Sequence, residues 1–311
     1  MNTLMLEKLD IQVDSLINHV GNTPLLPLRR VTSGLAPSVS VFAKAEWFNP
    51  GGSIKDRAAL NIIQTAINNG KLTQGKRLLD STSGNTGIAY ATFGAVMGIP
   101  VTLALPENAS AERIAILRSL GVELILTDAD EGPQGAMLLV REMAKNNPDK
   151  YFYADQYSNP TNWQAHYRST GPEIYYQSGE KITHFVAVMG TSGTMMGTGR
   201  YLKEQNPNIQ LVGGQPSKPF HGLEGMKHMA SAIQPAIYEA DVHDRIAEVE
   251  TEEAYDMVQR LGREEGLFVG LSSGAAAVAA LNVARELDEG VVVTIFPDAG
   301  YKYLSNEELW K

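Results

Sequence analysis

The sequence predicts an α/β protein of two lobes, each a mostly parallel twisted sheet with helices on both faces. Two observations predict this class. Beyond residue 75, short apolar runs alternate with longer segments of helical period, which is typical of strand–helix–strand units. Glycine-rich turns also fall where predicted strands enter helices, and sheets of this class bind ligands at those points. A chain of 311 residues is long enough for two lobes that share one cleft.

Each element follows from the same pattern. The predicted strands are Arg77–Leu79, Val101–Leu105, Val122–Thr127, Tyr151–Ala154, His184–Met189, Ile209–Gly213, Leu267–Val269 and Val291–Phe296. The predicted helices are Thr86–Met97, Ala111–Leu120, Pro133–Asn146, Trp163–Gln177, Met195–Gln205, Glu252–Glu265 and Gly274–Leu287. Gly98 and Gly266 are expected to end two of these helices, because glycine accepts the left-handed backbone of a helix C-terminus.

Composition excludes several classes of protein. The net charge of -9 argues against general nucleic-acid binding, which needs a basic face. The chain has no cysteine, so disulfides, thiolate nucleophiles and cysteine-based zinc sites are excluded, and we predict no metal site. No run approaches the roughly 18 apolar residues that span a bilayer, and the first ten residues lack a signal-peptide pattern. We therefore expect a cytoplasmic protein that does not bind membranes.

The stretch Asn49–Arg57 places a lysine beside a turn. It reads NPGGSIKDR, so Lys55 follows a Pro/Gly-rich turn and precedes the helix-like run Ala58–Ile63. A lysine held in such a place could bond covalently to a carbonyl cofactor. The alternative is an ordinary solvated lysine, which is the usual state of this side chain.

Three further turns carry polar groups. Ser81–Gly87 combines hydroxyls, an amide and helix-start N–H groups, a set that suits a carboxylate, although the same residues are common N-caps. Gly190–Thr194 follows a strand and opens a helix, so its N–H groups predict an anion nest for a phosphate, with a packing turn as the alternative. Gly270–Ala276 places two serines before a small-residue helix, where one hydroxyl could face a heterocyclic nitrogen.

Together, these turns resemble the cysteine synthases of the tryptophan synthase β-like (fold type II) pyridoxal phosphate family. The resemblance runs from Gly21–Leu25 to Asp298–Ser305, and it includes Gln156–Pro160 and Thr170–Ile174. It implies pyridoxal 5'-phosphate bound in the cleft between the lobes, and a homodimer. One departure lies in the segment Gly300-Tyr301-Lys302, where relatives usually carry Gly-Glu-Arg or Gly-Asp-Arg.

The resemblance also implies roles for individual residues. Lys55 matches the lysine that bonds to the cofactor, Asn85 matches the asparagine at the cofactor's ring hydroxyl, and Ser272 matches the residue that faces the pyridine nitrogen. The group that holds the substrate carboxylate matches Thr82, Ser83, Thr86 and Gln156. The phosphate loop matches Gly190, Thr191, Ser192, Gly193 and Thr194.

We predict two lobes with interleaved boundaries. A smaller mobile lobe comprises residues 1–26 and 49–158, and a larger lobe that binds the cofactor phosphate comprises residues 27–48 and 159–311. The segment Gln215–Asp244 has scattered prolines and glycines and no clean period. It is either a long excursion over the cleft or an irregular surface connection.

The reaction implied by the resemblance is a β-replacement. It makes L-cysteine or S-sulfocysteine from O-acetyl-L-serine or O-phospho-L-serine, with sulfur from sulfide, thiosulfate or the thiocarboxylate of a sulfur-carrier protein. Lys55 would act as the base at Cα. Ser192, at a position where A-type enzymes usually carry glycine, and the loop His221–Lys227 favour the B-type. Lys227 either attracts an anionic donor or is a solvated loop lysine.

Other functions compete with this interpretation. The nearest are a cystathionine β-synthase-like enzyme that takes homocysteine and a serine/threonine dehydratase that releases a keto acid. A regulatory binding module with this fold would be expected to have lost Lys55 or the phosphate loop, and both are intact. A nucleotide-binding oxidoreductase would need a G-x-G-x-x-G turn, and the glycine-rich turns described above lack that spacing.

Overall fold

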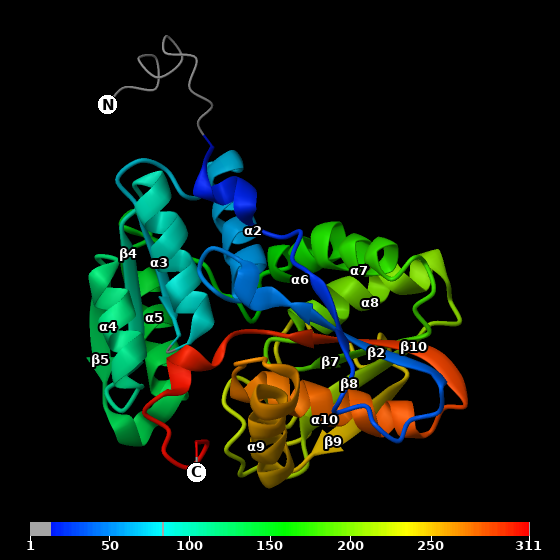
Figure 1. The fold of residues 1–311 in the computed structure, drawn as a ribbon. Helices are drawn as coiled ribbons and strands as arrows, with labels where there is room; N and C mark the ends of the chain where they lie inside the picture. The colour runs from blue at the N-terminus through cyan, green and yellow to red at the C-terminus, as the bar shows by residue number, and fades with distance from the viewer. Residues whose placement is uncertain (1–13, 83, 311) are drawn as a thin grey trace, which may run out of the picture.

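The computed structural model describes residues 14–82 and 84–310, which fold around two sheets. The larger sheet has the strand order β1-β2-β10-β7-β8-β9. These strands are β1 (Leu25–Leu28), β2 (Ser38–Ala45), β10 (Glu289–Phe296), β7 (His184–Val188), β8 (Gln210–Pro216) and β9 (Arg245–Val249). Only β1 runs antiparallel to its neighbour, and the other pairs are parallel. Figure 1 shows the two sheets side by side.

The smaller sheet has the order β5-β4-β3-β6, and all its pairs are parallel. Its strands are β3 (Arg77–Ser81), β4 (Val101–Pro106), β5 (Glu123–Thr127) and β6 (Tyr151–Tyr153). Every residue of β4 is buried, as expected for an inner strand covered by helices on both faces.

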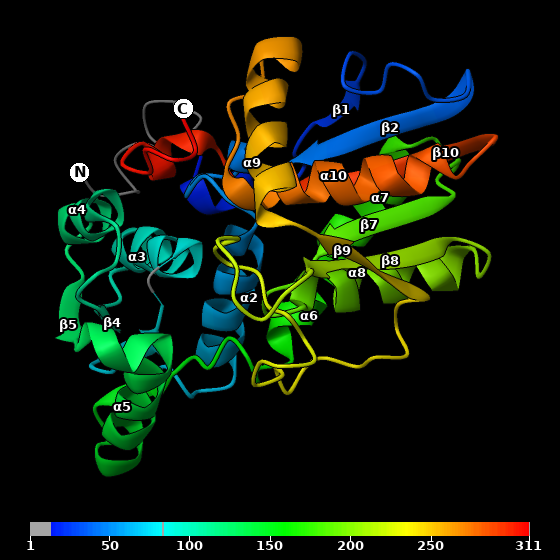
Figure 2. The ribbon, with the colours of Figure 1, turned by 90° about the horizontal axis from the view of Figure 1, so that it is seen from below.

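Helices cover both faces of the larger sheet (Figure 2). One face carries α9 (Thr251–Arg260) and α10 (Leu271–Arg285). The other carries α6 (Thr161–Ala165), α7 (Gly171–Gln177) and α8 (Gly193–Gln205), with a π-helical turn at His166–Thr170 between α6 and α7. The alanines of α10 allow it to pack closely, and a Cβ on Gly274 would lie 2.3 Å from the carbonyl oxygen of Ala254 on α9. Apolar residues therefore pack against both faces of the larger sheet.

The smaller sheet is covered in the same way. On one side lie α2 (Lys55–Asn68), α3 (Asn85–Met97) and α4 (Ala111–Ser119), whose apolar residues pack in one cluster with β3 and β4. On the other side lies α5 (Gly132–Asn146). Helix α2 contacts both α3 and α6, so it lies between the helices of the two sheets. The predicted fold class is confirmed.

Differences from the predicted elements are few. Leu267–Val269 was predicted as a strand, and this is wrong: Val269 makes only an isolated bridge to Ala299. The edge strands β1 and β9 and the inner strand β2 were missed. Gly98 and Gly266 do end helices in the left-handed conformation, with φ of 67° and 71°.

Candidate active site

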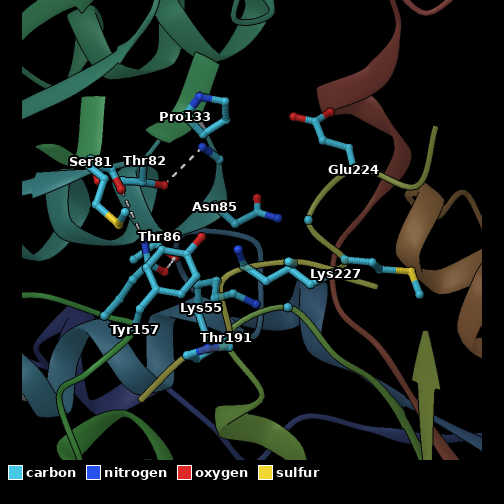
Figure 3. A pocket seen from close by; sticks show the side chains of 18 of the residues that line it. Lys55, Ser81, Thr82, Asn85, Thr86, Pro133, Tyr157, Thr191, Glu224 and Lys227 are labelled. Carbon is cyan, nitrogen blue, oxygen red and sulfur yellow. Dashed lines mark hydrogen bonds between the residues drawn. The ribbon is translucent and has the colours of Figure 1, made fainter. Parts of the chain in front are cut away.

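A cavity of about 760 Å³ lies where strands of both sheets end. Residues at the C-terminal ends of β3, β4, β7 and β10 contribute to its wall, as expected for a ligand site in parallel sheets. Nine of the predicted site residues line it, namely Lys55, Thr82, Asn85, Thr86, Gln156, Gly190, Thr191, Thr194 and Ser272. Figure 3 shows several of their side chains around the cavity. Ser83 lies outside the described residues.

Lys55 is the first residue of α2, and its side chain is half-buried in the cavity wall. Burial lowers the pKa of its amine, and the negative charges of Asp298 and Glu46 offset only part of this effect. A lowered pKa increases the fraction of neutral amine at neutral pH, the form that acts as nucleophile and base. Lys55 therefore combines access to the cavity with the chemistry that the sequence predicted.

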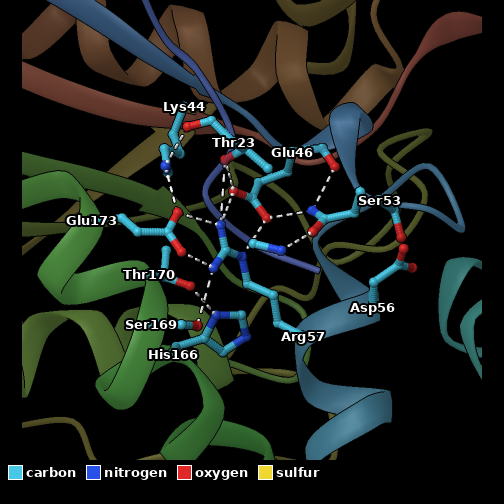
Figure 4. Close-up of polar contacts among 12 residues, drawn as sticks. Thr23, Lys44, Glu46, Ser53, Asp56, Arg57, His166, Ser169, Thr170 and Glu173 are labelled. Carbon is cyan, nitrogen blue, oxygen red and sulfur yellow. Dashed lines mark hydrogen bonds and ion pairs between the residues drawn. The ribbon is translucent and has the colours of Figure 1, made fainter. Parts of the chain in front are cut away.

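A buried ionic cluster fixes the first turn of α2 two residues after Lys55 (Figure 4). The Arg57 guanidinium donates from Nε to Glu46 Oε2 and from Nη1 to Glu173 Oε1, each at 2.7 Å. Lys44 Nζ lies 2.6 Å from the other oxygen of Glu173. Two cations and two anions thus balance, which makes the burial of all four groups tolerable. This cluster ties the helix of Lys55 to the 3-10 turn after β2 and to α7.

The turn Gly190–Thr194 opens α8 and holds an anion-binding geometry. In the described part of the chain, the N–H groups of Thr191, Ser192 and Thr194 donate to no protein acceptor. A Cβ on Gly190 would lie 2.1 Å from the Gly225 carbonyl oxygen, so only glycine permits this approach. Unpaired N–H groups at a helix N-terminus attract an anion.

Two residues of this turn do not line the cavity with side chains. Ser192 has a φ of 67°, and its Oγ donates to the carbonyl oxygen of Thr191 at 2.5 Å. A Cβ on Gly193 would lie 2.0 Å from Asn162 Oδ1. Any contribution of Ser192 and Gly193 to an anion site must therefore come from the backbone.

The residues predicted to bind the substrate carboxylate already form hydrogen bonds in the structure. Thr86 Oγ1 donates to Gln156 Oε1 at 2.7 Å, and Gln156 Nε2 approaches the Ser81 carbonyl oxygen at 3.5 Å. Thr82 Oγ1 accepts from the Gly84 N–H at 3.2 Å. The start of α3 and the segment after β6 thus meet at one wall of the cavity.

The two serines at the start of α10 differ in environment. Ser272 lines the cavity, whereas Ser273 is fully buried and donates to the carbonyl oxygen of Asp298 at 3.3 Å. The structure thus places the first of the two hydroxyls at the cavity, the one that the resemblance singled out.

Sequence reasoning missed a polar network behind Asn85. Asn85 Nδ2 donates to Asp298 Oδ2 at 2.8 Å, and Lys302 Nζ donates to Asn85 Oδ1 at 2.6 Å. The Tyr303 hydroxyl also donates to Asp298 Oδ2, at 2.9 Å. The only signal in the sequence was the unusual Gly300-Tyr301-Lys302 segment, and nothing in it indicated contact with Asn85.

The segment between β8 and β9 passes over the cavity, and Gly225–Lys227 and Ser231–Ala236 line it. The first of the two interpretations of Gln215–Asp244 is therefore correct. Lys227 is half-buried, and its Nζ lies 5.0 Å from the centroid of the Tyr157 ring. Burial lowers the pKa of the Lys227 amine.

Across residues 14–82 and 84–310, every helix is too short or too polar to cross a membrane. Over the same residues, no group of three or more His, Asp or Glu side chains is placed to hold a metal ion.

Residues 16–298 match the family model described as pyridoxal-phosphate dependent enzyme. The chain belongs to this family. Its cofactor is therefore pyridoxal phosphate, as predicted. The pyridoxal-phosphate dependent enzymes similar to it include a cysteine synthase from Aquifex aeolicus, 50% identical over 94% of this chain and 91% of the relative. A cysteine synthase B from Pseudomonas aeruginosa is 44% identical over 95% of this chain and 97% of the relative.

A solved structure has the same fold. The cysteine synthase of Entamoeba histolytica superimposes with a TM-score of 0.91 at 36% identity, covering 96% of this chain and 91% of that one. The predicted resemblance and the α/β fold are both confirmed.

The cavity of this pyridoxal-phosphate dependent enzyme fits the cofactor. Its volume of about 760 Å³ accommodates a small cofactor together with an amino acid. Unpaired N–H groups at the start of α8 suit a phosphate, the Lys55 amine has a lowered pKa, and the Ser272 hydroxyl lines the same cavity. These three kinds of group are chemically suited to a phosphate, an aldehyde and a ring nitrogen, which are parts of the cofactor.

Proposed function

We propose that this enzyme makes L-cysteine, or S-sulfocysteine, by β-replacement. The substrate is O-acetyl-L-serine or O-phospho-L-serine, and the sulfur comes from sulfide, thiosulfate or the thiocarboxylate of a carrier protein. One observation carries the proposal. A lysine of lowered pKa, an anion-binding helix start and a hydroxyl- and amide-rich wall meet at one cavity, in a chain whose relatives are cysteine synthases.

Lys55 has two tasks in this proposal. Its amine would hold the cofactor through the aldehyde carbon, with release of water. Once the substrate amine takes that place, the freed Nζ would take the Cα proton of the substrate and later return it. Pyridoxal phosphate, when bound, supplies an electron sink that stabilises negative charge at Cα. Because burial lowers the pKa of Lys55, a larger fraction of its amine is neutral and able to accept a proton.

Other residues hold the two ligands. The backbone N–H groups of Gly190–Thr194 and the hydroxyls of Thr191 and Thr194 bind the phosphate, Asn85 contacts the ring oxygen, and the Ser272 hydroxyl faces the ring nitrogen. The substrate carboxylate is held by Thr82, Ser83, Thr86 and Gln156. A neutral hydroxyl at the ring nitrogen does not hold that nitrogen protonated as a carboxylate would, and this favours elimination of the β-substituent over transamination.

The sulfur donor enters past Lys227 in this proposal. Its amine lies at the cavity wall, over the Tyr157 ring, and no described carboxylate pairs with it. An ammonium there would attract thiosulfate or a thiocarboxylate. Lys227→Ala is expected to weaken the apparent affinity for thiosulfate and leave that for sulfide nearly unchanged, since sulfide is small and needs no such contact.

Assembly, location and motion complete the proposal. The enzyme acts as a homodimer in the cytoplasm, and a sulfur-carrier protein is a possible donor partner. The lobe of residues 1–26 and 49–158 closes over the substrate relative to residues 27–48 and 159–311.

The deciding experiment uses purified holoenzyme. Borohydride reduction followed by peptide mapping should leave the reduced cofactor on Lys55. The visible spectrum should change when O-acetylserine or O-phosphoserine is added, and it should revert only with the correct sulfur donor. An unmodified Lys55 after incubation with excess pyridoxal phosphate would refute the proposal. Keto acid release without sulfur uptake would instead indicate a dehydratase.

A further inference from the structure

Lys302 is a buried cation that contacts two parts of the active site. It belongs to the 3-10 turn Gly300–Tyr303 after β10, and the residue is only 1% exposed. Its Nζ lies 2.6 Å from Asn85 Oδ1, 3.1 Å from the Gly52 carbonyl oxygen and 3.3 Å from that of Gly51. An ammonium has three N–H donors, and three oxygens are present to accept them. Lys302 thus joins the turn before Lys55 to the first residue of α3.

These contacts fix the orientation of the Asn85 amide. Oδ1 faces the ammonium of Lys302, which can only donate. Nδ2 faces Asp298 Oδ2 at 2.8 Å, and this oxygen is also held by the Tyr303 hydroxyl. A flipped amide would bring its N–H groups against the ammonium. One hydrogen bond would then be lost, and two donors would lie close together. The chemistry of its neighbours therefore allows one orientation only.

The fixed orientation determines what Asn85 presents to the cavity. Asn85 lines the cavity, whereas Lys302 and Asp298 lie behind it. One hydrogen of Nδ2 is used by Asp298, and the second has no partner among the described residues. Asn85 therefore faces a ligand as a hydrogen-bond donor, with its own oxygen turned away to Lys302.

We propose that Lys302 is a positioning residue that locks Asn85 as a donor and thereby stabilises the deprotonated ring oxygen of the cofactor. The proposal rests on the function given above, in which Asn85 contacts that oxygen. Without the ammonium, the amide is free to turn its own oxygen toward the cavity. Two oxygens would then face each other, and the ring oxygen would hold its proton to higher pH.

The test compares the absorption spectra of the holoenzyme and of Lys302→Met. The visible band of the lysine-bound cofactor grows at the expense of the near-ultraviolet band when the ring oxygen is deprotonated. Loss of one charge-assisted hydrogen bond should lower the ratio of the two bands at neutral pH about tenfold, and should weaken cofactor binding to the apoprotein by about the same factor. Lys302→Arg keeps a cationic donor and should restore the wild-type ratio within about twofold.

Lys203→Met is the matched control. It also removes a lysine that contacts a carboxylate and a carbonyl oxygen, here those of Asp244 and Pro207, and none of these three residues lines the cavity. It should leave the band ratio unchanged. An unchanged ratio in Lys302→Met, or an equal change in Lys203→Met, overturns the proposal.

A double-mutant cycle tests whether Lys302 acts through Asn85. In an Asn85→Ala background, Lys302→Met should no longer change the ratio, and additive effects would contradict the proposed route. If Lys302→Met does not fold, the band ratios of Lys302→Gln and Lys302→Arg test the proposal instead. The glutamine amide can itself turn, so its ratio should fall between those of the wild type and Asn85→Ala. Equal ratios in Gln, Arg and wild type would refute the idea.

Failure of this inference differs from failure of the proposed function. If the wild type carries no cofactor on Lys55, the proposed function itself is wrong. If the wild type carries it and the Lys302 variants keep its spectrum, only the role of Lys302 is wrong.

Discussion

Substitution of Glu173 by glutamine tests whether the ionic cluster around Arg57 stabilises the fold. Burial would raise the pKa of Glu173, but hydrogen bonds and charge attraction from Arg57 and Lys44 outweigh it and lower the pKa from 4.5 to about 2. One pKa unit is worth about 1.4 kcal/mol, so the ionised carboxylate contributes about 3 kcal/mol to the free energy of unfolding. The value agrees with the cost of about 3–5 kcal/mol for breaking a buried ion pair.

The sign of the pH dependence follows from the lowered pKa. The contribution is complete above pH 4.5 and is lost as the pH falls toward about 2, since the folded carboxylate must then be protonated. Urea unfolding of wild type and Glu173→Gln, at equal protein concentration, should differ by about 3 kcal/mol at pH 7. The difference should shrink below pH 4.5.

Glu123→Gln provides the control for this prediction. Glu123 pairs with Arg77 at 2.8 Å, close to the distances in the cluster, but its side chain is 52% exposed. Its loss should cost less than about 1 kcal/mol. A difference for Glu173→Gln no larger than that for Glu123→Gln, or one that stays constant down to pH 3, would refute the reasoning.

Three further outcomes are expected. Gly190→Ala should weaken cofactor binding to the apoprotein by at least about tenfold, because its Cβ would lie 2.1 Å from the Gly225 carbonyl oxygen. The control Gly262→Ala should leave cofactor binding unchanged, because no atom lies within 4 Å of its new Cβ. Burial raises the pKa of Asp56 from 3.8 to about 7, so the free energy of unfolding should fall as the pH rises between these values, and Asp56→Asn should flatten that slope in urea titrations. Ser272→Asp should increase transamination relative to β-replacement, and an unchanged product ratio would contradict its proposed role.

The sequence predicted the inner, contiguous parts of the fold best. Strands such as β4 and β7 are short apolar runs between turns, and local pattern alone identifies them. Strand β2 was missed because its main partner, β10, lies far along the chain, where Ser38 pairs with Glu289. Strand β9 was missed because RIAEV carries two charges and lies at a sheet edge. The hydrophobic period within a segment does not indicate which distant strand that segment will pair with.

In the candidate site, too, some residues could be predicted from the sequence and others could not. Residues at the start of a helix, such as Lys55, Asn85 and Ser272, could be predicted because turns between strand and helix mark the ligand-binding edge of a parallel sheet. The residues that hold these side chains in place through hydrogen bonds could not be predicted. Lys302 reaches Asn85 only through the folded path of the chain after β10, a contact 217 residues apart.

The two sheets differ in when they can form during synthesis on the ribosome. The four strands of the smaller sheet all lie between Arg77 and Tyr153, so this sheet can assemble once that stretch has emerged. In the larger sheet, β10 lies between β2 and β7 and comes last. Until Glu289–Phe296 emerges, β2 and β7 each present an open edge of unpaired N–H and C=O groups. A nascent chain stalled before residue 289 therefore carries two aggregation-prone edges, which makes this interval the point at which chaperone binding matters most.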